Sequence, residues 1–319
     1  MLEFLVYLKL FGGFVYLLLG GDLLVRGSLG LAKKSAIPPM VVGLTVVAMG
    51  TSAPELMVSG YSAISGHPDI AVGNIIGSNI ANILLVIGVP ALIFPITFNQ
   101  KGIGMQAGMM VAVTALFVLL CIFEPFTFVD SVLLLFLLVV FLGLTMRGTS
   151  IVPGLEEEVE EEMERVLGVP NITWKIVLYL ILGIVTLPLG ANLVVEGATG
   201  IARSWGVSEA IIGLSLIAIG TSLPELSTTV VSALHKSSDV AVGNVIGSNL
   251  LNILAIMGVT SMLADVPVDP NVMVWDIWVM LGCSLIVLVY ALGRRSVGPV
   301  AGVLFIGLYV VYLASLYHP

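Results

Sequence analysis

The chain repeats itself at an offset of 170 residues. Residues 43–88 align without a gap on residues 213–258, and 24 of the 46 paired positions are identical. The alignment extends upstream, where residues 20–34 match residues 190–204. Two stretches this similar are expected to share one fold, so the sequence predicts a molecule made of two equivalent halves.

Each half is expected to cross a membrane five times. Hydrophobic residues make up 58% of the 319 residues and charged residues only 10%, whereas about a quarter of the residues of a soluble protein are charged. A helix needs about 20 mostly apolar residues to cross the hydrocarbon core of a bilayer. Ten such stretches are expected, at 3–24, 39–64, 70–94, 104–123, 129–146, 174–195, 209–234, 240–263, 273–292 and 298–316. The predicted fold class is therefore an all-α integral membrane protein with ten transmembrane helices and no separate soluble domain.

Because five is an odd number, the second half enters the membrane from the opposite side. We expect a first five-helix repeat at 1–146, an acidic linker at 147–173 and a second five-helix repeat at 174–319. Inverted repeats are typical of secondary transporters, whose substrate site lies near the bilayer midplane between the halves. An ancient duplication without a transport function is the alternative.

The basic residues predict the orientation of the chain as a multi-pass protein of the cell membrane. Short cytoplasmic loops are enriched in Lys and Arg. With the N-terminus outside, ten of the twelve basic residues fall in inner loops: Arg26, Lys33, Lys34, Lys101, Arg147, Arg165, Lys175, Lys236, Arg294 and Arg295. Both termini are therefore expected outside. The linker, whose residues 155–165 include seven glutamates, is expected in the cytoplasm as a solvated segment.

Glu55 and Glu225 occupy equivalent positions in the middle of two predicted spans. A charge at the centre of a bilayer costs at least about 3 kcal/mol on insertion scales, so it needs a partner or a hydrated cavity. No Lys or Arg lies at comparable depth in the predicted spans. The simplest partner is a bound cation. Two protonated glutamates packed between helices are the alternative.

Proline predicts a helix break beside each glutamate. Pro54 and Pro224 follow the equivalent triplets Gly50-Thr51-Ser52 and Gly220-Thr221-Ser222. Proline has no amide donor and clashes with the carbonyl four residues earlier, and irregular backbone within a membrane is tolerated where it lines a site. Carboxylate, hydroxyl and free carbonyl oxygens are therefore expected close together, and Ca²⁺ takes about six to eight oxygen ligands of this kind.

A polar cluster follows each glutamate: Asn74, Ser78, Asn79 and Asn82 in the first half, then Asn244, Ser248, Asn249 and Asn252 in the second. Part of it forms a polar stripe, which Asn74 and Asn244 extend one turn earlier. Ser78 and Asn82 are four residues apart and share one helix face, and Ser248 and Asn252 repeat the pattern. Intervening glycines form GxxxG pairs, Gly73 with Gly77 and Gly243 with Gly247. Small residues of this kind let membrane helices approach closely. The polar residues are expected either to line an ion site or to join helices by hydrogen bonds.

The two glutamates together neutralise one divalent cation. Monovalent cations can share the same negative charge, so that binding of the two kinds of ion becomes competitive. Such competition for one site between the two halves is the physical basis of exchange.

At these residues the sequence resembles the cation/calcium antiporter superfamily, in particular its prokaryotic sodium/calcium exchangers. The resemblance covers nearly the whole chain and is carried by two motifs, G-T-S-x-P-E and G-N-x-x-G-S-N, each of which occurs twice at the same offset. It implies that the motif-bearing spans pack as a core. The first and sixth spans would then slide across that core to alternate access.

The resemblance also implies a ligand set. Ca²⁺ would be bound by Glu55 and Glu225 with the backbone carbonyls of Thr51 and Thr221. Flanking Na⁺ sites would use the carbonyls of Ala48 and Ala218 and the hydroxyls of Ser52, Ser78, Ser222 and Ser248. Asn82 and Asn252, from the polar stripe, complete the predicted site. No cofactor is expected, because the transported ions are the only ligands.

One position bears on whether the expected exchanger also depends on K⁺. The potassium-dependent exchangers carry Asp at the position of Asn252, as do some microbial sodium/calcium exchangers, whereas this chain has Asn at both equivalent positions. The resemblance therefore favours a K⁺-independent exchanger. The stoichiometry usual in the family, three Na⁺ for one Ca²⁺, moves one net charge and implies electrogenic exchange.

Several other functions remain open. The nearest is a proton-coupled antiporter for Ca²⁺ or another divalent cation, although His67, His235 and His318 all fall in predicted loops or at the terminus. A cation channel is a further alternative, but pores are commonly selected by rings of carbonyls or charges. An intramembrane hydrolase is also conceivable, but the predicted spans contain no histidine that could act as its base. No enzyme activity is therefore expected. The expected partners are the two ions and the lipid bilayer, with no nucleic acid and no obligate protein partner.

Overall fold

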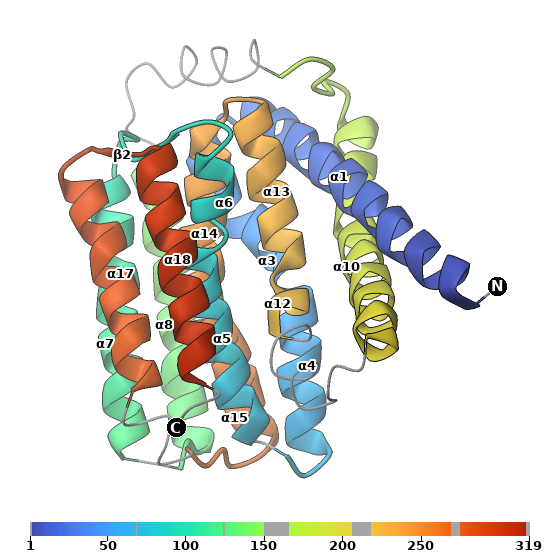
Figure 1. Cartoon of the computed structure of the whole chain (residues 1–319). Helices are drawn as coiled ribbons and strands as arrows, with labels where there is room; N and C mark the ends of the chain where they lie inside the picture. The colour runs from blue at the N-terminus through green and yellow to red at the C-terminus, as the bar shows by residue number, and fades with distance from the viewer. Residues whose placement is uncertain are drawn as a thin grey trace.

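A computed structural model describes residues 2–67, 69–123, 125–149, 166–205, 218–268 and 275–316 as a bundle of helices (Figure 1). Six of the described helices are long and apolar enough to span a membrane, and a bent helix pair makes a seventh such span. Two shorter apolar helices, α17 (Asp276–Leu292) and α18 (Pro299–Ser315), pack in the same bundle. The expected stretch 209–234 lies partly outside the described residues.

The remaining elements follow in chain order. The first half contains α1 (Leu2–Ser35), α2 (Pro39–Val42), a π-helical turn (Gly43–Val47), α3 (Ala48–Thr51), α4 (Ala53–Ile64), α5 (Asp69–Leu84), α6 (Gly88–Ala91), β1 (Ile96–Thr97), α7 (Ile103–Ile122) and α8 (Phe128–Thr149). The second half contains α10 (Thr173–Ser204), α12 (Ala218–Thr221), α13 (Leu223–Leu234), α14 (Ser238–Leu251), a π-helical segment (Asn252–Met257), α15 (Gly258–Leu263), α17, β2 (Ser296–Val297) and α18.

The two longest helices, α1 and α10, lie side by side at one flank of the bundle (Figure 1). Their seam is formed by glycines spaced seven residues apart in each helix: Gly13, Gly20 and Gly27 in α1, and Gly183, Gly190 and Gly197 in α10. A Cβ added at Gly190 would lie 2.8 Å from the backbone nitrogen of Leu17 and 3.0 Å from the carbonyl oxygen of Gly13. Backbone therefore meets backbone along the seam, which requires residues without side chains.

Both helices extend well beyond the predicted spans 3–24 and 174–195. In α1 the extension is favourable because its polar side chains find partners. Asp22 forms an i,i+4 ion pair with Arg26 at 2.8 Å, and such pairs stabilise a helix. Arg26, Lys33 and Lys34 consequently lie within α1, and not in a loop as predicted.

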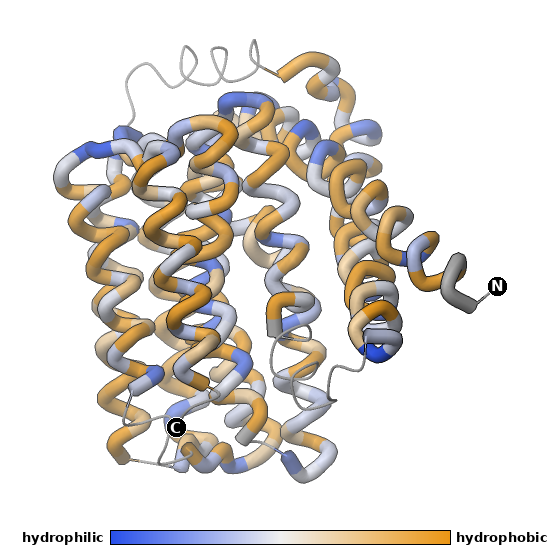
Figure 2. The backbone as a smooth tube through the Cα atoms, in the orientation of Figure 1, coloured by the Kyte–Doolittle hydropathy of each residue, from blue (hydrophilic) through white to orange (hydrophobic). Residues whose placement is uncertain are grey.

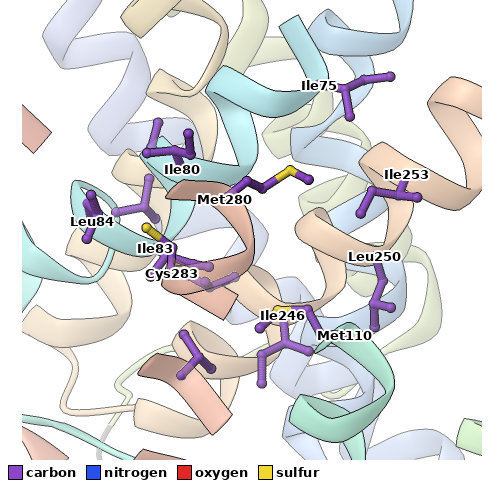
Figure 3. Packing of buried hydrophobic residues seen from close by; sticks show 14 of the residues in the cluster. Ile75, Ile80, Ile83, Leu84, Met110, Ile246, Leu250, Ile253, Met280 and Cys283 are labelled. Atoms are coloured by element: carbon purple, nitrogen blue, oxygen red, sulfur yellow. The ribbon is translucent and has the colours of Figure 1, made fainter. Parts of the chain in front are cut away.

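The core of the bundle is made by α5 and α14, the helices that carry the second repeated motif. In the most apolar window of the span Ser238–Leu263, 94% of the residues are buried, compared with 22% in the window of α8. Figure 3 shows Ile80 and Leu84 of α5 and Ile246 and Leu250 of α14 in the packed interior. Methionines of α7 and α17 fill the space beside them.

One end of the bundle, where α8 ends and α10 begins, is here named the linker end. At this end β1 pairs with β2 in an antiparallel ladder that joins loops from the two halves. Gln100 donates from Nε2 to Asp239 Oδ1 at 2.8 Å and ties the first turn of α14 to the pair. Figure 2 shows that hydrophilic residues gather at this end, above the apolar helices. The loops with the basic residues Lys236, Arg294 and Arg295 therefore share one end of the bundle, as predicted.

Candidate ion-binding site

Two interrupted helices form the centre of the candidate site. Ser52 separates α3 from α4 with φ −81° and ψ 9°, and Ser222 separates α12 from α13 with φ −85° and ψ 4°. The first interruption bends its span by 46°. A proline in the first turn after each break cannot donate a backbone hydrogen bond, so the carbonyls of Gly50 and Gly220 receive none from it. The predicted breaks are therefore confirmed at equivalent positions.

The two interrupted helices run in opposite directions. Figure 1 shows α4 extending away from the linker end after the break, whereas α13 extends toward it. Glu55 and Glu225 lie in the first turns of these two helices. A helix N-terminus stabilises negative charge on neighbouring groups. The arrangement thus brings two carboxylates and two helix N-termini to the middle of the bundle from opposite sides.

Glu55 and Glu225 are both buried, with 1% and 0% of their surface exposed. They lie close enough to repel each other when both are ionised. Ser52 Oγ donates to Glu225 Oε1 at 3.0 Å across the boundary between the halves. Thr51 and Ser248 also lie beside the Glu225 carboxylate. The two halves therefore meet at this pair of acids.

Three of the four carboxylate oxygens of this pair have no hydrogen-bond partner among the described residues. These are both oxygens of Glu55 and Oε2 of Glu225. Neither acid forms an ion pair with Lys or Arg within the described part of the chain. Leaving a buried polar group unpaired costs about 1–3 kcal/mol, and more for a charged group. A bound cation would relieve this cost.

The serines and asparagines of the polar stripe are buried in both halves, and many of their polar atoms lack a partner among the described residues. Ser78, Ser248, Asn82 and Asn252 are all buried. The side-chain atoms without a partner in the described ranges include Ser222 Oγ, Ser248 Oγ, Asn82 Oδ1, Asn82 Nδ2 and Asn252 Oδ1. Both halves therefore contain buried, neutral oxygen atoms that could act as ligands. Oxygen atoms of this kind are the ligands that Ca²⁺ and similar hard cations prefer.

The structure describes the backbone ligands implied by the resemblance more fully in the first half than in the second. Thr51 is fully buried at the end of α3, and its hydroxyl donates to Ala48 O at 3.3 Å. Ala48 O also accepts a hydrogen bond from the Ser52 N–H at 3.0 Å. Thr221 ends α12, and Ala218 begins the same helix at the edge of the described residues. The carbonyl of Ala48 is thus already engaged by two donors in this conformation.

Asn74 and Asn244 have a role that the predicted site did not include. Each donates from Nδ2 to the backbone carbonyl of the acid in its own half, at 3.3 Å to Glu55 O and 3.4 Å to Glu225 O. Asn244 Oδ1 in addition accepts from Thr51 Oγ1 at 3.1 Å. These amides fix the first turns of α4 and α13. Their position at the start of the predicted polar stripe was the available signal.

Asn79 and Asn249, which belong to the same motif, contact outer helices, and Asn79 Oδ1 also accepts a hydrogen bond from Asn252 Nδ2 at 3.5 Å. Asn79 Nδ2 contacts Met280 Sδ at 3.6 Å, and Asn249 Nδ2 contacts Met110 Sδ at 3.7 Å. Both contacts join a core helix to an outer helix, α17 or α7. The bonding role expected as the alternative for the polar stripe therefore applies to these two asparagines and to the amide of Asn252.

The second GxxxG pair brings α14 directly against the span that precedes Glu55. A Cβ added at Gly243 would lie 2.3 Å from Met40 O and 3.0 Å from the Cα of Gly43. One added at Gly247 would lie 2.4 Å from Leu44 O. The predicted packing role of these glycines is confirmed. Gly73 and Gly77 have no described atom within 4 Å of such a Cβ, and the equivalent facing segment, 210–217, lies outside the described residues.

Paired interrupted helices, a buried pair of acids and a lining of oxygen donors define an ion-transporting membrane protein. The chain belongs to the sodium/calcium exchanger protein family, whose profile matches residues 5–147 and again residues 175–317. The two matched segments start at residues 5 and 175 and so differ by 170 positions (175 − 5), the offset of the internal repeat.

Individual relatives agree with this assignment. The chain is 38% identical to the putative antiporter CaxA of Alkalimonas amylolytica over 96% of both chains. It is 35% identical to the inner membrane protein YrbG of Escherichia coli K12, covering 96% of this chain and 94% of that one. Its structure resembles that of the sodium-calcium exchanger NCX_Mj with a TM-score of 0.83 and 31% identity, over 98% and 99% of the two chains. The protein is therefore a multi-pass membrane protein and a cation/Ca²⁺ antiporter, a transporter and not an enzyme.

Proposed function

We propose that this protein exchanges Na⁺ for Ca²⁺ by alternating access around Glu55 and Glu225. The observation that supports the proposal most strongly is the buried acid pair, of which three oxygens lack a partner in the described part of the chain. A divalent cation balances two carboxylates, and the surrounding oxygen donors meet its need for several ligands. Ten spans in two inverted halves, with both termini outside and the acidic linker in the cytoplasm, belong to the same proposal.

The proposed ligands divide into two sets. Glu55, Glu225 and the carbonyls of Thr51 and Thr221 bind Ca²⁺. The Na⁺ ligands are the carbonyls of Ala48 and Ala218 and the hydroxyls of Ser52, Ser222, Ser78 and Ser248, with the amides of Asn82 and Asn252 beside them. Na⁺ and Ca²⁺ compete because both draw on the charge of the same two acids. The repeated serines and asparagines support Na⁺ as the coupling ion because they remain neutral and supply oxygen.

We further propose that exchange is electrogenic and independent of K⁺. Asn252 is uncharged, so the formal charge of the described site resides in two glutamates. A tenfold Na⁺ gradient provides about 1.4 kcal/mol per ion, so three ions provide roughly 4 kcal/mol. One net charge crossing about 100 mV adds roughly 2.3 kcal/mol. Together these terms would sustain a Ca²⁺ gradient of more than about four decades.

Transport by the purified protein in proteoliposomes tests the proposal. Uptake of ⁴⁵Ca²⁺ is expected when an outward Na⁺ gradient is imposed, and not with a K⁺ gradient alone. A membrane potential, positive inside, that draws the extra Na⁺ outward should increase the initial rate. Uptake driven by a proton gradient instead would identify the alternative, a proton-coupled divalent-cation antiporter. Efflux of Ca²⁺ down its own gradient, without any counter-ion, would indicate a channel.

A substitution at Ser78 separates the two ions. Ser78→Ala removes a buried hydroxyl from the proposed Na⁺ ligands while both carboxylates remain. The Na⁺ concentration for half-maximal exchange is expected to rise several-fold, with a smaller change in Ca²⁺ affinity. Ser261→Ala is the matched control, because that buried hydroxyl donates to Met257 O of its own helix at 2.7 Å. Equal losses of Na⁺ and Ca²⁺ affinity in Ser78→Ala would contradict its assignment to Na⁺.

A further inference from the structure

The two halves of the structure differ in how the long helices contact the interrupted ones. Ser227 and Val231 of α13 are 6% and 3% exposed, because α1 lies over them. The equivalent residues of α4, Met57 and Tyr61, are 73% and 75% exposed. In this conformation α1 therefore covers α13, while the corresponding face of α4 is left open.

The contact between α1 and α13 is close. Ser227 Oγ donates to the carbonyl oxygen of Leu17 at 2.6 Å. A Cβ added at Gly21 would lie 3.1 Å from Ser227 Oγ and 3.2 Å from Val231 Cγ2. The absence of a side chain at Gly21 is what allows the two helices to approach this far. The linker end is consequently closed at this helix pair.

A charged cluster secures the same contact at the linker end. His235, the residue after α13, places Nε2 at 2.7 Å from Asp22 Oδ1. Arg26 places Nε at 2.8 Å from the other oxygen, Asp22 Oδ2. The three side chains are only 21–29% exposed. The Arg26 contact is an ion pair without hydrogen-bond geometry, whereas the hydrogen bond between His235 and the Asp22 carboxylate is charge-assisted and so stronger than a neutral one. Asp22 therefore receives its two partners from α1 and from the end of α13.

Among the described residues, the other half shows no equivalent contact. At an offset of 170 residues, the positions of Asp22, Arg26 and His235 are occupied by Asn192, Glu196 and Ser65. Asn192 donates to Glu196 within α10 at 3.2 Å, and Glu196 forms an ion pair with Lys9 of α1 at 2.6 Å. The described polar contacts of this pair thus bind α10 to α1 and not to α4.

We propose that Asp22, Arg26 and His235 form a one-sided latch that holds α1 on α13 and favours the conformation closed at the linker end. Asp22 and His235 are positioning residues, because they act on the helices and touch no ion. The inference depends on the proposed alternating access, in which α1 and α10 shift relative to α4 and α13. It adds that the two end states are energetically unequal, since only one of them contains the latch.

Two engineered cysteine pairs would measure the balance between the states. Gly21→Cys with Ser227→Cys reports on the α1–α13 contact, because a Cβ added at Gly21 would lie 3.1 Å from Ser227 Oγ, within reach of a disulfide. This pair alters the close contact itself, so latch variants are compared only with the same cysteine pair in an otherwise unchanged chain. Ala191→Cys with Met57→Cys reports on the equivalent α10–α4 contact. Disulfide formation rates would be followed by mass spectrometry in proteoliposomes, in a fixed buffer that contains choline as the only major cation. The natural Cys121 and Cys283 are buried, and protein without added cysteines gives the background.

Releasing the latch should change these rates in opposite directions. Asp22→Ala or His235→Ala is expected to slow the first pair and accelerate the second, which shifts the ratio of the rates about tenfold, the size expected of one charge-assisted hydrogen bond. The double variant should shift the ratio no further than either single variant, because both remove the same contact. An unchanged ratio, or two independent and additive shifts, would overturn the proposal.

The control substitution is Lys9→Gln, which removes a charge from α1 and its ion pair with α10 but leaves the α13 contact intact. It is expected to leave the ratio unchanged, and a shift as large as that of Asp22→Ala would also count against the latch. Crosslinking requires no transported ion, so this result is independent of the coupling ion. Failure of Na⁺-driven ⁴⁵Ca²⁺ uptake with an intact latch effect would disprove the proposed function alone.

Discussion

Glu55→Gln or Glu225→Gln is expected to abolish Ca²⁺ transport. Each substitution keeps the size and burial of the side chain but removes one of the two charges that balance a divalent cation. A unit charge acting on another at 4 Å is worth about 4 kcal/mol at an effective dielectric constant of 20. For a divalent ion the loss is at least this large and corresponds to more than about 10³-fold weaker binding. Transport would be measured as Na⁺-driven ⁴⁵Ca²⁺ uptake in proteoliposomes.

A binding measurement shows whether these variants are folded. Ca²⁺ should raise the unfolding temperature of the detergent-solubilised wild-type protein, because a ligand that binds the folded state stabilises it. The variants should unfold cooperatively but without this Ca²⁺-dependent shift. Glu196→Gln is the matched control, because its carboxylate is largely exposed and pairs with Lys9 outside the site; we expect normal transport. Full activity in either Glu55→Gln or Glu225→Gln would refute the assignment of the acid pair.

Gly247→Ala is expected to have the largest effect on the stability of the core. The added Cβ would lie 2.4 Å from Leu44 O, 2.7 Å from Leu44 Cα and 2.8 Å from Ala48 Cβ. Backbone at these distances must move, and overpacking of this kind typically costs about 1–3 kcal/mol and occasionally more. The movement would also displace Ala48, a proposed Na⁺ ligand. Both the unfolding temperature and the transport rate are therefore expected to fall.

Gly108→Ala provides the comparison for this prediction. Gly108 lies in α7, and no described atom is within 4 Å of a Cβ added there. Alanine is more favourable than glycine inside a helix by about 0.5–1 kcal/mol, so this variant should be at least as stable as wild type. If Gly247→Ala unfolded at the same temperature as Gly108→Ala, the close approach of α14 to Leu44 would not constrain the core.

The local features of the site could be predicted because they follow from short-range chemistry. Pro54 and Pro224 interrupt their helices wherever they occur, and the repeat places Glu55 and Glu225 in equivalent first turns. The packing role of Gly243 was equally readable from its spacing. Each of these predictions required only a few neighbouring residues.

Tertiary contacts determined what the sequence did not predict. α1 continues beyond its predicted span, and its Asp22 bonds to His235, which is 213 residues away in the sequence. Adjacent residues such as Ser78 and Asn79 point about 100° apart on a helix, but the partner of Asn79, Met280, is 201 residues away and could not be predicted. The pairing of β1 with β2 joins two-residue strands that carry no recognisable pattern.

The glycine seam has a consequence for leakage. Because backbone meets backbone at positions such as Gly13, Gly190 and Gly197, independent sliding of α1 and α10 would break many close contacts together. The two helices should therefore move as one rigid pair that reaches both faces of the membrane. When this pair closes the site toward one face, it opens the site toward the other. The protein would then form no continuous water-filled path, and the ion gradients would drive exchange without leakage.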